Sequence, residues 1–285
     1  MFIVRTQGQD IPCEIRGKIK HQTEAATPVA VGDNVVISLS PDGTGMIEEI
    51  GRRRSMFFRP SKGSESKKQI IAANIDQLAI VAAIRKPDLK PGLIDRFLIA
   101  ARIGNLEPVI IINKIDLGGD PFPEEMRIAY FRLGIPIFLI SALTGKGMDS
   151  LENILKDKKT IFAGHSGVGK STILNHLMPG LNLRVCEVSD YSNRGVHTTS
   201  LVELFELPRG GFVVDSPGLK VLGLWEVARE QLDQYYPEFI ELAGQCRFVG
   251  CSHTHEPGCA VKKAVDEGLI PAFRYRSYQT IYDSL

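Results

Sequence analysis

The sequence of 285 residues has few cysteines, a single tryptophan and no long hydrophobic run. Its longest apolar stretches, residues 78–84 and 109–112, are far shorter than the roughly 20 residues that a helix needs to cross a bilayer. Lysine and arginine number 34 against 33 aspartate and glutamate, so the net charge of +1 excludes a whole-molecule attraction to nucleic acid or membranes. The chain does not open with the charged and then apolar segments of a secretory signal. We therefore expect a cytoplasmic protein with no membrane partner, on which any basic surface is local.

The N-terminal part has the strand spacing of a small β-barrel. Short β-type runs at residues 2–6, 12–19, 34–38 and 46–50 are separated by turn signals. This spacing predicts an antiparallel barrel, either of the oligonucleotide-binding (OB) type or a generic barrel without a ligand.

A basic stretch follows at residues 51–68, with seven lysines and arginines against the single acid Glu65. Together with Phe57 and Phe58 it could form a surface that binds phosphates and stacks bases. A solvated linker is the alternative interpretation.

From about residue 75 the hydrophobic period changes. Apolar strands alternate with amphipathic helices, which is typical of a mostly parallel α/β sheet covered on both faces. The predicted strands are residues 75–84, 109–112, 135–140, 160–163 and 211–214, and the predicted helices are residues 93–103, 124–133, 148–156 and 170–177. Beyond about residue 224 lie a cysteine and histidine cluster and two stretches compatible with helix, 260–267 and 271–282.

Residues 164–171, GHSGVGKS, match the phosphate-loop pattern G-x-x-x-x-G-K-[ST] at every fixed position. The match follows an apolar strand and opens a helix, which is the context that the motif requires. Backbone N–H groups of such a loop surround phosphate oxygens, Lys170 neutralises the β and γ phosphates, and Ser171 offers its hydroxyl to Mg²⁺. The predicted phosphate contacts are Gly164, His165, Ser166, Gly167, Val168, Gly169, Lys170, Ser171 and Thr172.

The base is indicated by the sequence NKID at residues 113–116, directly after an apolar strand. Guanine presents two adjacent N–H donors, so its recognition needs an acceptor-only carboxylate, which Asp116 supplies. Asn113 would link this loop to the phosphate loop, and a backbone N–H of the later Ser-Ala pair could meet the guanine carbonyl. The predicted ligand is GTP or GDP, held at its base by Asn113, Lys114, Ile115, Asp116, Ser141 and Ala142.

Two further segments fit the switches that sense a γ-phosphate. Asp215, after an apolar strand, can hold Mg²⁺ through water, and the N–H of Gly218 can detect the γ-phosphate. Earlier, residues 195–199 read GVHTT, where a threonine could complete the Mg²⁺ shell. The spacing does not decide between Thr198 and Thr199, and we select Thr199.

Catalysis is expected to need an unusual residue. Ras-like proteins place a water-orienting Gln directly after the DxxG glycine, but this chain has Leu219 there. A leucine cannot orient water, so slow intrinsic turnover is predicted. His197 is the candidate that holds or deprotonates the attacking water. Lys170 and Thr199 are the other predicted catalytic groups. The alternative is a histidine that contacts only RNA or backbone.

Three cysteines and a histidine lie close together near the C-terminus. Cys246, Cys251 and Cys259 with His253 supply three thiolates and one imidazole, a set that describes a closed, tetrahedral structural zinc site. Such an appendage would need the metal to fold. His255 is a rival for the fourth position, and buried unligated cysteines or a redox cluster are the alternatives to a metal.

The order of the nucleotide motifs is permuted. Ras-like GTPases begin with the phosphate loop, whereas here NKID precedes it and the DSPG segment ends the series. Because every motif follows a strand, the same site can assemble once the ordinary termini are joined. The second switch then leads directly into the C-terminal segment.

Taken together, these motifs resemble those of the ribosome small-subunit-dependent GTPases, which are circularly permuted GTPases with an N-terminal OB domain and a C-terminal zinc domain. The resemblance covers nearly the whole chain. It rests on AANIDQ at 72–77, Asp95-Arg96, NKID, GHSGVGKS, GVHTT, DSPG and the cysteine cluster. It implies His253 as the fourth zinc ligand, and binding to the small ribosomal subunit and its rRNA late in assembly. It also implies much faster GTP hydrolysis there than alone.

We therefore predict a multidomain α/β protein with three parts. These are an OB-like β-barrel over residues 1–62, a circularly permuted P-loop GTPase domain over 63–223, and a zinc-binding domain with C-terminal helices over 224–285. The expected chain is a monomer that uses Mg²⁺ with GTP and one structural Zn²⁺. A nucleotide-gated RNA-binding adapter with incidental hydrolysis, and a permuted GTPase of large-subunit assembly, are the alternatives.

Overall fold

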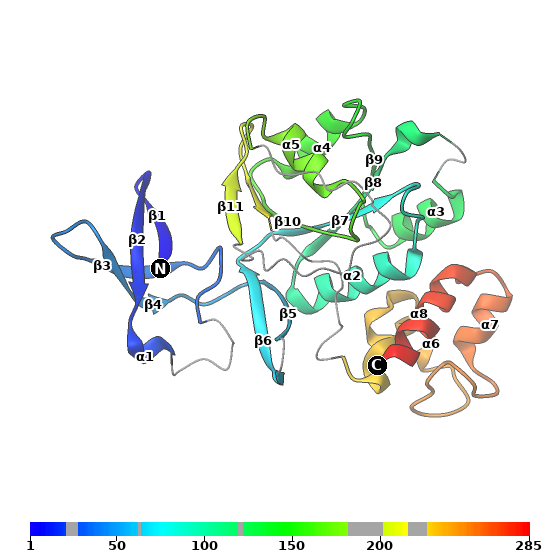
Figure 1. Ribbon diagram of the computed structural model, residues 1–285. Coiled ribbons are helices and arrows are strands. Elements are labelled where there is room, and N and C mark those ends of the chain that lie inside the picture. Colours follow the sequence, from blue (N-terminus) through cyan, green and yellow to red (C-terminus); the bar gives the residue numbers. More distant parts are fainter. Residues whose placement is uncertain (21–27, 62–63, 119–121, 182–201, 216–226) are drawn as a thin grey trace.

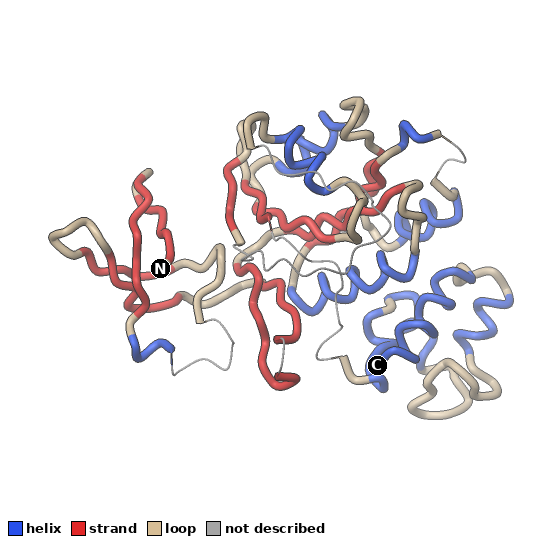
Figure 2. Tube along the Cα trace, in the orientation of Figure 1, coloured by secondary structure: helices blue, strands red, loops and turns tan. Residues whose placement is uncertain are grey.

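The computed structural model describes residues 1–20, 28–61, 64–118, 122–181, 202–215 and 227–285. Figure 1 shows three parts in chain order: a β part at the N-terminus, an α/β part in the centre and a C-terminal part beside it. Figure 2 shows that the C-terminal part consists of helices and loops. This arrangement has the elements of the predicted fold class.

The N-terminal sheet has the strand order β1-β2-β4-β3. Its strands are β1 (Phe2–Thr6), β2 (Gln9–Ile15), β3 (Val35–Leu39) and β4 (Gly45–Ile50), and the short helix α1 (Gly17–Lys20) follows β2. Side chains that alternate along the strands, among them Ile11, Cys13 and Ile47, form a small core of their own. The β2–β4 pair is parallel, which corrects the expectation of a wholly antiparallel barrel. No pairing among described residues joins β1 to β3, so these strands form half a barrel.

Residues 51–68, expected to be a basic surface or a linker, are largely part of a hairpin. Strands β5 (Met56–Ser61) and β6 (Ser64–Ala73) pair antiparallel. Phe57 is buried in the central core, so it cannot stack bases. The Arg53 guanidinium donates to the carboxylate of Asp33 at 2.7 Å, and Arg59 donates to Gln69 at 3.0 Å. The limit expected at residue 62 lies outside the described residues, and the predicted domain limits stay a prediction.

The central sheet has the order β11-β12-β10-β7-β8-β9. Its neighbours pair in parallel except β11, which is antiparallel to β12. The strands are β7 (Gln77–Ala83), β8 (Glu107–Asn113), β9 (Ile137–Leu139), β10 (Lys159–Ala163), β11 (Glu203–Glu206) and β12 (Phe212–Asp215). Both faces of β8 are buried, since Ile110 and Ile112 belong to one core and Ile111 to the other.

Helices cover both faces, as the alternating pattern predicted. Helices α2 (Pro91–Gly104) and α3 (Glu124–Arg132) contribute to one core, and α4 (Met148–Leu155) and α5 (Lys170–Leu177) to the other. Helix α2 begins with Pro91 at its first turn and ends at Asn105 in the left-handed conformation, both favourable at those positions.

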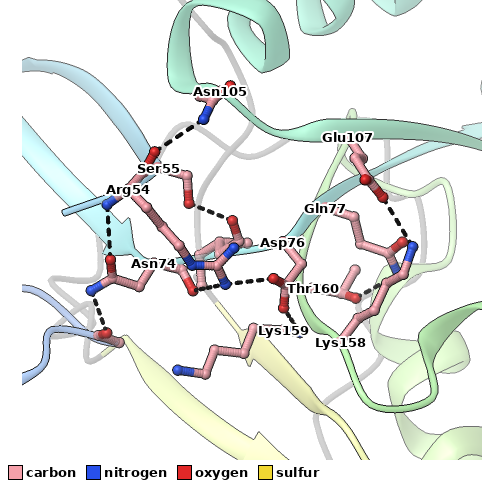
Figure 3. Close-up of polar contacts among 12 residues, drawn as sticks. Arg54, Ser55, Asn74, Asp76, Gln77, Asn105, Glu107, Lys158, Lys159 and Thr160 are labelled. Atoms are coloured by element: carbon pink, nitrogen blue, oxygen red, sulfur yellow. Dashed lines mark hydrogen bonds and ion pairs between the residues drawn. The ribbon is translucent and has the colours of Figure 1, made fainter.

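The AANIDQ segment joins the N-terminal sheet to the hairpin (Figure 3). Asn74 is buried, with a left-handed φ of 53°. Its side chain accepts from the backbone N–H of Arg54 and donates to the carbonyl of Gly32, each at 3.0 Å. Asn105, at the end of α2, donates to the carbonyl of Arg54 at 3.1 Å.

The same segment also enters the central sheet at the amino ends of its strands (Figure 3). The Asp76 carboxylate accepts from the backbone N–H of Lys159 at 2.6 Å and from the guanidinium of Arg54 at 2.5 Å. Buried Gln77 donates to Thr160 at 2.8 Å. The segment therefore links the chain between β4 and β5 to strand β10. This link lies at the sheet edge opposite the predicted nucleotide loops.

The C-terminal part packs against α2. It contains the 3₁₀ segment η2 (Arg229–Tyr235) and helices α6 (Pro237–Ala243), α7 (Ala260–Asp266) and α8 (Ala272–Ser284), of which only the last two were predicted. Tyr236, Phe239 and Tyr278 stack in its core. The buried guanidinium of Arg274 bridges Asp95 of α2 and Glu238 of α6.

Among the described residues, no helix combines the length and the apolar character needed to span a bilayer.

Candidate nucleotide site and metal cluster

The phosphate-loop sequence connects β10 to α5, as expected. Gly164 has a φ of +151°, and a Cβ there would lie 2.1 Å from the carbonyl oxygen of Val81. Gly169 has a φ of +95°, and its Cβ would lie 2.3 Å from Nδ2 of Asn113. Any other residue would be strained and would push the loop away from its neighbours. The two glycines thus let the loop lie directly against β7 and the NKID loop.

Lys170 begins helix α5 and reaches back across the loop. Its Nζ donates to the carbonyl oxygens of Gly164 at 2.7 Å and His165 at 2.9 Å. The ammonium therefore lies in the loop, where the helix N-terminus adds its positive end to the field. Ser171 and Thr172 follow in the first turn and are half-buried. Such a cradle can hold a polyphosphate.

Asn113 connects three loops. It is buried at the end of β8, its Nδ2 donates to the carbonyl of Val168 at 2.9 Å, and its Oδ1 accepts from the backbone N–H of Ala142 at 3.0 Å. The sequence predicted the first contact. The second was missed, because nothing in the spacing relates Asn113 to the Ser141-Ala142 pair. One amide side chain therefore holds the phosphate loop and both base loops together.

The base loops carry the expected polar groups. The exposed Asp116 carboxylate accepts a hydrogen bond from the buried Ser141 hydroxyl at 2.5 Å, which orients it. Lys114 has a left-handed φ of 66°, and its ammonium donates to the carbonyl of Lys86. Burial lowers the pKa of Lys114. The part played by Lys86 was not predicted, since no sequence motif marks a backbone carbonyl.

Asp215 is the last residue of β12, which lies beside β10 in the sheet. This position brings the start of the DSPG segment to the same sheet edge as the phosphate loop. His197, Thr198, Thr199, Gly218 and Leu219 lie outside the described residues. Their predicted roles at Mg²⁺, the γ-phosphate and the attacking water stay predictions.

The four predicted zinc ligands come together in the C-terminal part. One ligand atom from each of Cys246, Cys251, His253 and Cys259 lies within 4.8 Å of all the others. Nδ1 of His253 is 3.6 Å from the sulfur of Cys246 and 3.4 Å from that of Cys259. Zinc bonds of about 2.3 Å to sulfur and about 2.0 Å to nitrogen in a tetrahedron give a sulfur–nitrogen separation of about 3.5 Å. The residues therefore fit a four-coordinate zinc ion.

His255 does not belong to this cluster. It is exposed, and its Nδ1 contacts the hydroxyl of Thr254 at 3.0 Å. Burial raises the pKa of the thiols of Cys251 and Cys259, because a thiolate is costly in this environment. A bound cation would supply the compensating positive charge. The cluster could thus hold a metal ion.

A phosphate loop, a guanine-type loop and a parallel sheet, with the loops in permuted order along the chain, define a circularly permuted P-loop GTPase. The RsgA GTPase family matches residues 50–225. The chain belongs to this family and is a GTPase, a hydrolase of GTP.

Relatives extend the likeness over nearly the whole chain. The chain is 39% identical over 280 residues to the small ribosomal subunit biogenesis GTPase RsgA of Bacteroides fragilis, covering 97% of this chain and 90% of the relative. It is 40% identical over 293 residues to the protein of the same name from Chlorobaculum parvum, with coverage of 100% and 94%.

Two solved structures have the same architecture. YjeQ from Thermotoga maritima is 34% identical, with a TM-score of 0.75 and coverage of 98% of this chain and 91% of YjeQ. YloQ, described as a circularly permuted GTPase, is 32% identical, with a TM-score of 0.70 and coverage of 97% and 86%. The predicted family and fold class are thereby confirmed.

Proposed function

We propose that this GTPase hydrolyses GTP to GDP and phosphate in the biogenesis of the small ribosomal subunit. The enzyme binds this subunit, and the subunit stimulates GTP hydrolysis by the enzyme. The observation that carries the nucleotide part is Asn113, whose two hydrogen bonds hold the phosphate loop and both base loops in one site. The names of the relatives support the ribosomal part. The acting form is a cytoplasmic monomer.

In this proposal each loop has a separate task. Asp116 accepts the two N–H donors of guanine, and a backbone N–H of the loop at residues 141–143 faces the guanine carbonyl. Lys170 and the loop amides stabilise the charge that develops on the phosphates. Ser171, Thr199 and Asp215 would hold Mg²⁺, which would supply positive charge at the phosphates. The N–H of Gly218 senses the γ-phosphate, and His197 holds or deprotonates the attacking water.

The zinc ion is structural in this proposal. Three thiolates and one imidazole leave no coordination position for water, so the metal would stabilise the C-terminal part rather than act in hydrolysis. The half-barrel and the C-terminal part flank the GTPase and are proposed to contact rRNA. The GTP form would bind the subunit and the GDP form would leave.

The first experiment is steady-state GTP hydrolysis by the purified chain, alone and with purified small subunits. Large subunits are the control. A slow basal rate that only small subunits raise is the expected result. Equal stimulation by large subunits, or none by either, would overturn the ribosomal assignment but leave the GTPase class intact.

A second experiment addresses the proposed role of His197. The substitution His197→Ala should lower the subunit-stimulated rate by about 10²- to 10⁴-fold, the range for loss of a general base or water-positioning group. Subunit binding in the presence of a non-hydrolysable GTP analogue, measured by co-sedimentation, should not change. Equal losses of binding and of hydrolysis would instead indicate that His197 contacts RNA.

A further inference from the structure

The two ring nitrogens of His253 face different partners. Nδ1 points to the sulfurs of Cys246 and Cys259, at 3.6 and 3.4 Å. Nε2 lies on the other side of the ring, 3.7 Å from Oδ2 of Asp233. The His253 side chain is 1% exposed, and no described group forms a hydrogen bond with Nε2.

When an imidazole binds a metal through Nδ1, its Nε2 requires a hydrogen-bond acceptor. A neutral imidazole that binds a metal through Nδ1 carries its proton on Nε2. A buried N–H without an acceptor is costly, and metal-binding histidines almost always donate this proton to a carboxylate, a carbonyl or water. The carboxylate of Asp233 lies 3.7 Å from Nε2, and a shift of about 0.8 Å would bring it to the usual hydrogen-bond distance of about 2.9 Å.

We propose that Asp233 is a positioning residue of the metal site, whose carboxylate accepts the Nε2–H of His253 and so aims Nδ1 at the metal. This inference rests on the proposed zinc site and is independent of GTP hydrolysis. Asp233 lies on η2, 20 positions before His253, so no ligand-type spacing points to it.

The other contacts of His253 leave this task to Asp233. The Tyr275 hydroxyl donates to the backbone carbonyl of His253 at 2.8 Å, which holds the main chain. The Phe239 ring meets the imidazole edge to face at 5.8 Å, which limits its tilt. Glu256, the other acid near the ring, accepts from the backbone N–H of Ser252 through Oε1 at 2.8 Å, whereas the carboxylate that lies 3.7 Å from Nε2 is that of Asp233.

The proposed contact also holds a particular stretch of chain. Segment η2 is the first described element after β12, and fully buried Leu232 anchors it in the C-terminal core. Through Asp233, the metal site would hold the chain that arrives from the DSPG segment. Metal binding and the placement of η2 would therefore stabilise each other.

The test compares the full-length chain with Asp233→Ala, Asp233→Asn and a matched control, Glu230→Gln, which alters an exposed acid on the same element. Zinc content is measured by elemental analysis, and zinc affinity by competition with a chromophoric chelator. Asp233→Ala should weaken zinc binding by about 10- to 100-fold, the range for loss of an outer hydrogen-bond partner. Asp233→Asn should have an intermediate effect because its amide oxygen still accepts, and the control should stay within about twofold of the wild type.

A second readout separates positioning from a general loss of stability. With Co²⁺ in place of Zn²⁺, Asp233→Ala should change the energies of the visible d–d bands while keeping the intensity of a four-coordinate site. If Asp233→Ala does not fold, Asp233→Asn supplies both measurements. Wild-type affinity and wild-type bands in the substituted chains would overturn the role of Asp233 alone. A wild-type chain that retains no zinc would overturn this role together with the zinc site, whatever its GTP hydrolysis.

Discussion

At the scale of single residues, Asn113 holds the loops of the nucleotide site together. Its amide is the one side chain that bonds to both the phosphate loop and the second base loop among the described residues. The sequence identified Asn113 through its place in NKID, because that motif follows an apolar strand. Its contact with Ala142 joins positions 29 apart, which no local pattern encodes.

Asn113→Ala should weaken GDP and GTP binding. Two hydrogen bonds of about 0.5–1.5 kcal/mol each would be lost, which corresponds to roughly 5- to 150-fold in affinity. Titration with a fluorescent guanine nucleotide measures the change. Asn34→Ala, at an exposed position just before β3, serves as the control. Unchanged affinity would mean that the loops hold their places without this amide.

Asp76 should make stability depend on acid pH. Burial alone would raise its pKa, but hydrogen bonds from the Lys159 backbone and the Arg54 guanidinium bring the pKa below its ordinary value of 3.8. A carboxyl whose pKa is lower in the folded state contributes stability above its unfolded pKa, and this contribution is lost as the pH falls through the folded pKa. As the pH is lowered below about 5, the urea concentration at the unfolding midpoint should therefore decrease. The decrease should be smaller in Asp76→Asn. Identical pH profiles would contradict this role.

Several proposed functional residues show where prediction from sequence stops. The phosphate and guanine motifs have fixed spacing and a required strand context, so their loops could be placed at one sheet edge. Asp233 has no such pattern, because its relation to His253 depends on how η2 packs. The roles of His197 and Thr199 rest on chemistry alone.

At the scale of elements, helix α2 contacts the central sheet, the β5–β6 hairpin and the C-terminal part. Ile94 and Phe97 belong to the central core, whereas Ile99 belongs to the C-terminal core. At its end, Gly104 lies so close to the hairpin that a Cβ would be 2.2 Å from the carbonyl oxygen of Met56. The amphipathic pattern predicted this helix but not its second apolar contact, because the pattern does not say which partner covers each face.

The buried ion triad between α2 and the C-terminal helices should be highly sensitive to single substitutions. Arg274 is 3% exposed in its side chain and pairs with Asp95 and Glu238. Arg274→Met would leave a buried charge on Asp95 and should cost about 3–5 kcal/mol in the free energy of unfolding. The double substitution Asp95→Leu with Arg274→Met should be more stable than Arg274→Met alone. Urea unfolding measures both, and simply additive losses would contradict the expectation.

Elements with a clear hydrophobic period were predicted close to their observed limits. Helix α5 matches residues 170–177, and β1 matches residues 2–6. The β5–β6 hairpin was missed because the basic side chains of residues 51–68 dominate the pattern, although Asp33 pairs with one of them, Arg53, just before β5. Segment η2 and helix α6 were missed for the opposite reason, since their short apolar runs have no clear period.

At the scale of the whole molecule, the zinc ligands are also part of the C-terminal core. Cys246, Cys251 and Cys259 pack with Phe239 and Tyr278 in one cluster. Removal of zinc by a strong chelator should therefore abolish hydrogen-exchange protection in α6, α7 and α8, while β7, β8 and β10 keep theirs. Unchanged protection in a chain shown to be free of metal would contradict a structural role for the ion.

The permuted order of the loops also determines the sequence of events while the chain is being synthesised. Strand β7 is made first in the central sheet, β8 and β9 then extend it on one side, and β10 and β12 complete the other. At about 5–20 residues per second, the base-recognition half, up to Ala142, emerges seconds before the phosphate loop. A nascent chain therefore completes its guanine loops before it can hold a phosphate, the reverse of the order in a Ras-like protein.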